Sequence, residues 1–171
     1  MKCLVTGGAG FIGSHLVDRL LKEGNNVLVI DNFSTGRPEN LNHQKGSKNL
    51  ELVNADISDL KKISPYFAGI ERVFHLAALA DIVPSMVNPL EYFHSNVTGT
   101  VNVLEASRNA GVKRFVYTAS SSCYGIPDVY PTPETSDIRP QYPYALTKYL
   151  GEEAALHWGQ VYKLPVVSLR L

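Results

Sequence analysis

The sequence has few of the residues on which disulfide-rich, zinc-binding or nucleic-acid-binding proteins depend. It holds only two cysteines, Cys3 and Cys123, which fit neither a disulfide framework nor a zinc ligand set. Lys plus Arg and Asp plus Glu both number 16, whereas a nucleic-acid binder usually carries a basic excess. No apolar run approaches the roughly 20 residues that span a bilayer, and glycines at 7 and 8 interrupt the N-terminal apolar stretch before it forms a signal-peptide core. We therefore expect a cytosolic protein with reduced thiols that binds neither nucleic acid nor membrane.

The composition is that of one globular domain covering 1–171. Hydrophobic residues make up 44% of the 171 residues and charged residues 19%, which excludes a disordered chain. The last residues, 166–171, have the pattern of a buried strand, which is an unusual end for a complete domain. The histidines at 15, 43, 94 and 157 have no carboxylate or cysteine at ligand spacing, so no metal site is expected.

Short apolar runs alternate with helical patterns along the whole chain. Strands are expected at 2–6, 26–30, 50–55, 72–77, 114–118 and 165–171, and helices from about 12 to 24, 59–67, 89–110 and 143–162. The strands mostly lack a polar–apolar alternation, which predicts a parallel sheet with helices on both faces. With right-handed crossovers, this order gives a doubly wound α/β sheet of the Rossmann type, with strand order 3-2-1-4-5-6.

The helix expected at 89–110 has a clear start and stop. Asn88 is the expected N-cap, Pro89 suits the first helical position, and Glu91 completes a capping box. Gly111 is expected to close the helix. The expected apolar stripe consists of Leu90, Phe93, Val97, Val101 and Leu104.

The first turn carries a glycine pattern typical of a dinucleotide site. Residues 6–13 read Thr-Gly-Gly-Ala-Gly-Phe-Ile-Gly, so Gly10 and Gly13 belong both to G-x-G-x-x-G, which starts at Gly8, and to G-x-x-G-x-x-G, which starts at Gly7. Such glycines allow a tight turn and let the backbone approach a pyrophosphate. The N–H groups of Phe11 and Ile12, at the start of the following helix, are the expected donors to it.

An acidic residue ends the second expected strand, 18 residues after the last glycine of the turn. At this place Asp31 would bind the adenosine ribose hydroxyls and repel a 2′-phosphate, which favours NAD over NADP. Arg37 lies close by and could accept a phosphate, so NADP stays open.

The third and fourth strands end in further candidates at the same edge of the sheet. Asp56 could bind the adenine amino group, with Ile57 contributing backbone, or it could cap a turn. Small residues after the fourth strand would let a cofactor pass close to the backbone, whereas His75 itself is expected to pack within the sheet; the run is His75-Leu76-Ala77-Ala78.

A tyrosine and a lysine stand four residues apart at the start of the last expected helix. Tyr144 and Lys148 therefore share one helical face. A nearby ammonium lowers the pKa of a phenol, and a phenolate can take a proton from a substrate hydroxyl. The fifth strand ends in Thr-Ala-Ser-Ser-Ser at 118–122, whose hydroxyls could bind a sugar oxygen, whereas Cys123 has no histidine placed to activate it.

Together these motifs resemble the extended short-chain dehydrogenases/reductases, specifically the nucleotide-sugar epimerases such as UDP-glucose 4-epimerases. The resemblance covers essentially the whole chain. It rests on the glycine turn and on Asp31-Asn32-Phe33-Ser34-Thr35-Gly36, Asp56-Ile57, His75 to Ala78, Asn96-Val97-Thr98-Gly99-Thr100, Ser120 before Tyr124-Gly125, and Tyr144 with Lys148.

The resemblance implies a tightly bound NAD, contacted also by Asn32 and Ser34, and epimerisation at C4 of a nucleotide sugar through a 4-keto intermediate. Tyr144 would take the proton of the 4-hydroxyl, and Lys148 would hold the nicotinamide ribose and lower the pKa of Tyr144. Ser120 would bind the sugar oxygen, unless Ser121 or Ser122 takes that part. Asn96 would support the backbone near the nicotinamide, and 83–85 would lie where the substrate loop runs.

The resemblance also implies which other reactions are alternatives to epimerisation. Nucleotide-sugar 4,6-dehydratases carry an Asp-Glu pair where this chain has Ser121-Ser122, and uronate decarboxylases usually have a Glu there, so epimerisation is favoured. Asp31 disfavours a simple NADPH-dependent reductase. A non-catalytic NAD-binding module, or a half-enzyme that binds NAD without turnover, stays open because the substrate domain of the family is expected to lie beyond residue 171. A UDP-sugar is the expected substrate, and a homodimer through a four-helix bundle of the 89–110 and 143–162 helices is implied.

Overall fold

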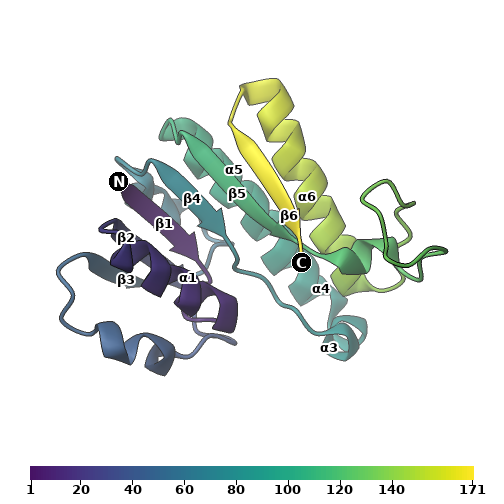
Figure 1. Ribbon diagram of the computed structural model, residues 1–171, viewed down its shortest axis with the longest axis horizontal. Coiled ribbons are helices and arrows are strands. Elements are labelled where there is room, and N and C mark those ends of the chain that lie inside the picture. Colours follow the sequence, from purple (N-terminus) through teal and green to yellow (C-terminus); the bar gives the residue numbers. More distant parts are fainter.

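The structure is a computed structural model that describes residues 1–171, built around one six-stranded parallel sheet (Figure 1). The strand order β3-β2-β1-β4-β5-β6 confirms the predicted doubly wound α/β fold. The strands are β1 (Lys2–Thr6), β2 (Asn26–Asp31), β3 (Leu50–Asn54), β4 (Arg72–His75), β5 (Arg114–Ala119) and β6 (Val166–Arg170).

Helices connect the strands in the predicted alternation. They are α1 (Phe11–Lys22), α2 (Leu60–Ile63), α3 (Ile82–Val87), α4 (Pro89–Tyr92), α5 (Gly99–Asn109) and α6 (Pro143–Tyr162). Three 3₁₀ turns span Pro38–Gln44, Ser64–Phe67 and Ser121–Tyr124, and a π-helical segment, Phe93–Thr98, joins α4 to α5. The sequence did not predict α3, nor the first 3₁₀ turn, in which Leu41 is the one apolar residue and packs into the cluster under α1. None of these helices is long and apolar enough to cross a membrane.

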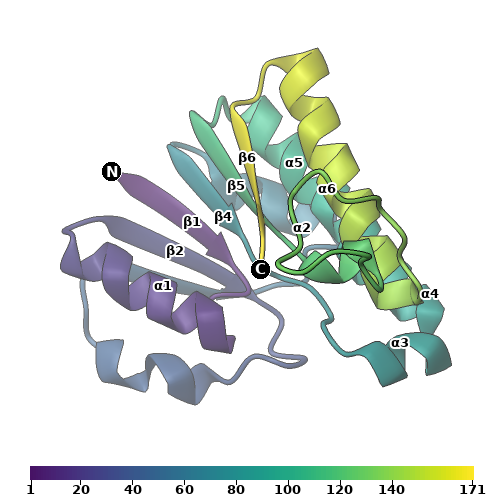
Figure 2. The ribbon, with the colours of Figure 1, turned by 45° about the vertical axis from the view of Figure 1, so that its right-hand side comes forward.

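The two faces of the sheet are covered unequally (Figure 2). On one face, α1 packs over β1 and β2 around eight buried residues; on the other, α2, α5 and α6 pack around 18. All residues of β1 and β2 except the first are therefore buried, whereas β5 and β6 alternate between more and less buried positions. The expectation of helices on both faces thus holds for β1 and β2 but not for β5 and β6.

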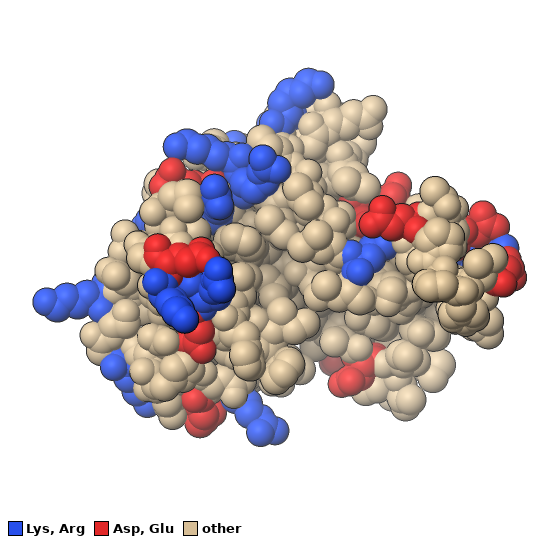
Figure 3. Space-filling model, in the orientation of Figure 1, with Lys and Arg blue, Asp and Glu red and all other residues tan.

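The uncovered part of the sheet is apolar. Val167 and Leu169 of β6 are 37% and 48% exposed on the face that carries α1 further along the sheet. Seen from this face, the surface between α1 and the loop that precedes α6 carries few charged side chains (Figure 3).

The segment 89–109 corrects the predicted long helix in two respects. The Asn88 side chain makes no capping bond; only its backbone oxygen accepts, from the N–H of Glu91 (3.2 Å). Leu90 is 82% exposed, and of the predicted stripe only Leu104 is buried; the other buried positions include Tyr92, Asn96, Thr100 and Val103. The wider turn of the π-helical segment rotates the buried face away from the stripe that a regular 3.6-residue period predicts.

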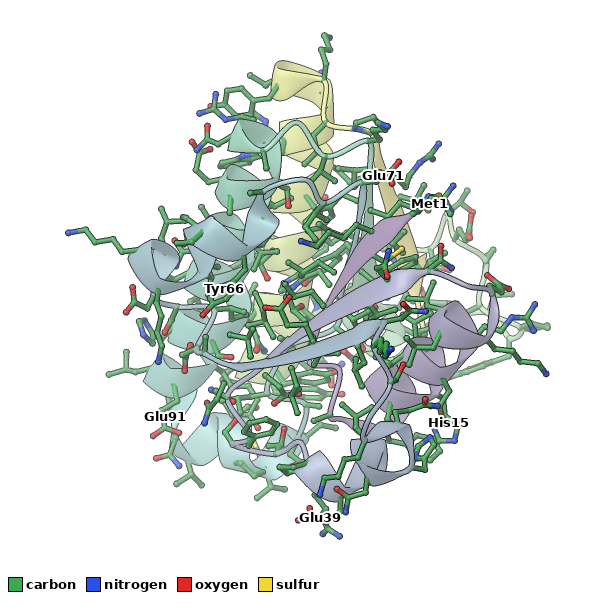
Figure 4. The ribbon with its side chains drawn as sticks, turned by 90° about the vertical axis from the view of Figure 1, so that its left-hand side faces the viewer. Met1, His15, Glu39, Tyr66, Glu71 and Glu91 are labelled. Atoms are coloured by element: carbon green, nitrogen blue, oxygen red, sulfur yellow. The ribbon has the colours of Figure 1, made fainter.

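At the amino ends of the strands, Glu71 connects three of them. Its carboxylate accepts from the backbone N–H of Lys2 (3.2 Å) and from Nζ of Lys113 (3.2 Å), and Figure 4 shows Glu71 close to Met1. These contacts lower the pKa of Glu71. This edge lies opposite the carboxyl ends of the strands, where ligands of such sheets bind.

Both cysteines are buried and unpaired. Cys3 lies in β1 and Cys123 in the turn that follows β5. Burial raises the pKa of both thiols, as expected for packed residues without an activating partner.

Candidate active site

The turn between β1 and α1 depends on the absence of side chains at two of its glycines. Gly7 has φ +70°, and a Cβ there would lie 2.7 Å from the backbone nitrogen of Ala77. A Cβ on Gly13 would overlap the carbonyl oxygen of Gly7. The close packing fixes the turn, and α1 begins at Phe11 with N–H groups free to receive an anion.

Asp31 stands at the end of β2 with its side chain turned towards the same turn. Its carboxylate accepts from the N–H groups of Ala9 (2.9 Å) and Phe33 (2.9 Å), and the residue is only 7% exposed. No cation pairs with this buried carboxylate. Gly36 also packs here, because a Cβ on it would lie 2.9 Å from both carboxylate oxygens. The Asp31 carboxylate can therefore accept hydrogen bonds from hydroxyls, and its negative charge would repel a phosphate.

A cleft of about 360 Å³ runs along the carboxyl edge of the sheet from this turn to β5. Twelve of the residues predicted from the sequence line it: Gly7, Gly10, Phe11, Ile12, Gly13, Asp31, Asn32, Ser34, Ile57, Leu76, Ala77 and Ala78. Thr35, Gly36 and Thr118, which belong to the motifs noted in the sequence, line it as well; the five lining residues that the sequence did not single out are Ile30, Ala55, Leu79, Ala80 and Ser95. These residues lie close in the chain to predicted positions, and Ser95, which reaches the cleft from the π-helical segment, precedes the predicted Asn96.

Asp56 lies outside this lining. One oxygen accepts from Nδ2 of Asn32 (2.8 Å), and the other accepts from the N–H (2.8 Å) and Oγ (2.6 Å) of Ser58. These hydrogen bonds lower its pKa against the opposing effect of burial, which is the largest single contribution. The geometry is that of the turn cap that the sequence left open as an alternative.

Tyr144 and Ser120 meet beside the end of β5. The Tyr144 hydroxyl lies 3.3 Å from Oγ of Ser120, which is also 2.7 Å from Oγ of Ser122. Ser121 has no such contact. Of the three serines, Ser120 is thus the one placed against the tyrosine. It lies between Ala119, where β5 ends, and Ser121, where the 3₁₀ turn begins.

Lys148 follows one turn later on α6 and is buried to 5% exposure. Its ammonium donates to the carbonyl oxygen of Thr118 (2.5 Å) and lies 4.6 Å from the ring centre of Tyr117. Burial lowers the pKa of Lys148 to about 8, and the nearby Glu152 carboxylate opposes this shift. The lysine is thus held by the strand end at which the cleft finishes.

Asn96 links the cleft to α6 from within the π-helical segment. Its side-chain oxygen accepts from the N–H of Leu79 (2.8 Å), and its Nδ2 donates to the oxygens of Leu79 (3.0 Å) and Thr147 (3.1 Å). Asn96 thus holds the backbone after β4 in place, although it does not itself line the cleft. No group of three or more His, Cys, Asp and Glu side chains is placed to hold a metal ion.

The fold and the cleft define a Rossmann-type α/β protein with a dinucleotide-shaped turn and a Tyr-x-x-x-Lys pair at the carboxyl edge of its sheet. The chain belongs to the NAD-dependent epimerase/dehydratase family, whose model matches residues 3–171.

Relatives within this family carry out different reactions. The chain is 44% identical to UDP-glucose 4-epimerase of Mycolicibacterium smegmatis over 167 residues, which cover 96% of this chain and 53% of that protein. It is 42% identical to UDP-glucuronic acid decarboxylase 4 of Arabidopsis thaliana over 135 residues, covering 79% of this chain and 29% of that protein. The chain spans about half the length of the epimerases that it matches.

Solved structures match the whole chain closely. UDP-glucose 4-epimerase of Thermotoga maritima with UDP-glucose gives a TM-score of 0.93 at 39% identity, covering 99% of this chain and 55% of the other. The dTDP-glucose 4,6-dehydratase of Streptomyces venezuelae, solved with NAD bound, gives 0.95 at 32% identity with the same coverage.

Proposed function

We propose that this chain binds NAD in the cleft and that, in a full-length protein containing it, the reaction is epimerisation of a nucleotide sugar at C4. The observation that carries the proposal is the contact of Tyr144 with Ser120 beside the end of the cleft, with Lys148 one helical turn away. The presence of both the tyrosine and the lysine argues against a purely non-catalytic NAD-binding module.

The residues present fit the cofactor. The turn leaves no room for a Cβ at Gly7 or Gly13, so backbone N–H groups can approach a pyrophosphate. The buried, unpaired carboxylate of Asp31 suits the ribose hydroxyls of NAD and repels the extra phosphate of NADP. When bound, NAD supplies the reversible oxidation and reduction of the sugar carbon.

The side chains of the chain itself would manage the proton and the sugar. Tyr144 would take the proton of the 4-hydroxyl and return it, because its hydroxyl lies beside Ser120 at the place where the sugar oxygen would bind. Ser120 would hydrogen-bond the same sugar oxygen, and Lys148 would hold the ribose next to the nicotinamide. Between the two half-reactions the 4-keto sugar would rotate in the site and present its other face, so that C4 ends with the opposite configuration.

Ser121 and Ser122 favour epimerisation over the two related reactions. A dehydratase needs an acid and a base to remove water, and neither serine supplies a carboxylate at this place. Decarboxylation of a nucleotide uronate is the second candidate, because decarboxylases are also among the relatives at about 40% identity. Incubation of the full-length protein with UDP-glucose, UDP-N-acetylglucosamine and UDP-glucuronate, with product analysis, separates the candidates.

Two measurements test the proposal, one for NAD binding by the present chain and one for catalysis by the full-length protein. Calorimetric titration of the present chain should show NAD binding that is tighter than NADP binding, and Asp31→Asn should narrow that preference. In the full-length protein, Tyr144→Phe should abolish epimerisation while NAD binding survives. Turnover of that variant near the wild-type rate would refute the role given to Tyr144.

The proposal extends to assembly through the helices that the family resemblance pointed to. The outer surfaces of the 89–109 segment and α6 carry exposed apolar side chains, among them Phe93 (36%), Leu146 (37%) and Leu156 (44%). A four-helix bundle between two copies would cover them. Light scattering after size exclusion should then give twice the monomer mass.

A further inference from the structure

Five buried polar residues form one connected series of hydrogen bonds from the end of β1 to α6. Each is exposed by 1% or less, so none relies on bulk water for its hydrogen bonds. The members of this polar chain are Thr6, His75, Thr100, Asn96 and Thr147.

His75 on β4 is the second member of the polar chain, between Thr6 and Thr100. Its Nδ1 lies 2.7 Å from Oγ1 of Thr6 at the end of β1, and its Nε2 lies 2.9 Å from Oγ1 of Thr100 on α5. The imidazole therefore connects β1, which leads into the glycine turn, with α5, which covers the face of the sheet opposite α1.

The hydrogen-bond partners determine which ring nitrogen of His75 carries the proton. The Thr100 hydroxyl donates to the backbone carbonyl of Asn96 (2.6 Å), which can only accept, so it presents a lone pair to Nε2. Nε2 must then carry the hydrogen, and Nδ1 accepts from the Thr6 hydroxyl. Both nitrogens are satisfied in the neutral ring, and a second proton would have no acceptor.

The two ends of the polar chain reach the two parts of the proposed site. At one end, Oγ1 of Thr6 also accepts from the N–H groups of Leu76 (3.2 Å) and Ala77 (3.3 Å), which line the cleft. At the other end, Oγ1 of Thr147 donates to the backbone oxygen of Tyr144 (3.0 Å).

We infer that His75 is a positioning residue that couples the cofactor cleft to the helix carrying Tyr144, through Thr100 and Asn96. The inference rests on the proposed function, because positioning has a purpose only if NAD occupies the cleft. It assigns no contact with substrate or cofactor to His75.

Burial, and after it the charge of one nearby group, favour the neutral ring of His75. The ring of Tyr117 on β5 lies 5.7 Å from the imidazole, and Lys148 on α6 adds a positive charge nearby. No carboxylate hydrogen-bonds to the imidazole. Protonation would thus place a second cation in the same buried region.

Thr100 offers a matched pair of variants for the test. Thr100→Val keeps the shape of the side chain but removes the hydroxyl that joins His75 to Asn96, whereas Thr100→Ser keeps the hydroxyl and loses a methyl group. NAD affinity is measured by calorimetry well below each variant's unfolding temperature. Long-range ¹H–¹⁵N spectra of the histidines and ¹³C spectra of the tyrosine rings are recorded without ligand.

The expected result is a neutral His75 with its proton on Nε2 from pH 8 to pH 5. Thr100→Val should bind NAD about fivefold to tenfold more weakly than wild type and shift the Tyr144 ring resonance, whereas Thr100→Ser should stay within about twofold. A merely structural role would lower the unfolding temperature of both variants without separating them in affinity.

Two outcomes overturn the inference: a proton on Nδ1 of His75, or wild-type affinity and an unmoved Tyr144 resonance in Thr100→Val. Failure of the wild-type chain to bind NAD overturns the proposed function instead. In that case the Tyr144 resonance still decides whether the polar chain positions α6.

Discussion

β1 and β2 lie between two layers of side chains, whereas β5 and β6 have a packed layer on one face only. In the first region, the features that shape the site are backbone features: glycines without room for a Cβ and N–H groups that bind Asp31. In the second region, they are buried polar side chains, among them Lys148, Glu152 and Asn96. Close packing shapes the first region, whereas hydrogen bonds and charge shape the second. Added side-chain volume should therefore damage the first region most, and removal of a polar or charged group the second.

The largest effect is expected from Gly13→Ala in the first region. The added Cβ would overlap the carbonyl oxygen of Gly7 and lie 2.8 Å from Cα of Gly8, so the turn would have to open. NAD affinity, measured by calorimetry, should fall by about 100-fold or more. The control is Gly159→Ala on α6, where a Cβ would lie 3.2 Å from the oxygen of Leu164, and where affinity should change by less than about twofold. Equal effects would remove the contrast between the regions.

The second prediction sets a buried ion pair against an exposed one. Glu152 is buried between α6 and β6, where it accepts from Nε of Arg170 (2.9 Å) and Oγ of Ser168 (2.7 Å). Glu152→Gln should lower the free energy of unfolding in urea by about 2 to 3 kcal/mol, because the charge of Arg170 loses its partner. Glu23→Gln, which breaks the exposed pair with Arg19 in the first region, should cost less than about 0.5 kcal/mol. A cost for Glu152→Gln as small as that for Glu23→Gln would mean that charge does not hold β6 to α6.

The third prediction compares one substitution on the same face of the sheet in both regions. Val29 on β2 is fully buried under α1, whereas Val167 on β6 is 37% exposed. Val29→Ala should destabilise the protein by about 2 kcal/mol and Val167→Ala by less than about 1 kcal/mol, since only the first leaves a closed cavity. Urea unfolding of both variants at the same concentration gives the two values; similar losses would show that something covers β6 in solution.

The smallest effect is a pH dependence that arises at the boundary between the regions. Burial lowers the pKa of His75 to about 3, below the unfolded value of 6.5. Between these values the unfolded chain binds one proton more than the folded chain, so stability falls as the pH falls below 6.5. From pH 6 to pH 5 the wild type should lose about 1 kcal/mol more than His75→Gln, as measured by urea unfolding. Parallel losses in the two proteins would mean that the imidazole titrates normally.

The first region could be predicted from the sequence apart from the 3₁₀ turn Pro38–Gln44. Its strands, the glycine turn and Asp31 follow from short-range rules: apolar runs, turn glycines and an acidic residue at a strand end. Tyr144 and Lys148 could be placed as well, because their spacing is a helical one. The strand order also followed from the alternation of elements.

The second region differs from the prediction where polar residues are buried and an apolar residue is exposed. The local pattern around Asn96 and Thr100 does not predict burial, although the family resemblance gave Asn96 a place near the nicotinamide. Both are buried because Asn96 bonds to Leu79 and Thr147, and Thr100 to His75 on β4. The π-helical segment then shifts the buried face of the 89–109 segment, so Leu90 points outward although its spacing predicts burial. Partners far away in the chain cannot be read from local periodicity.

The two buried cysteines give each region its own reporter. Cys3 lies in the first region and Cys123 in the second, and neither thiol can be reached by a reagent while the surrounding structure is closed. Their rates of reaction with a thiol reagent therefore measure how often each region opens. A bound dinucleotide would slow the labelling of both thiols equally if the sheet opens as one cooperative unit, and unequally if its two ends open independently.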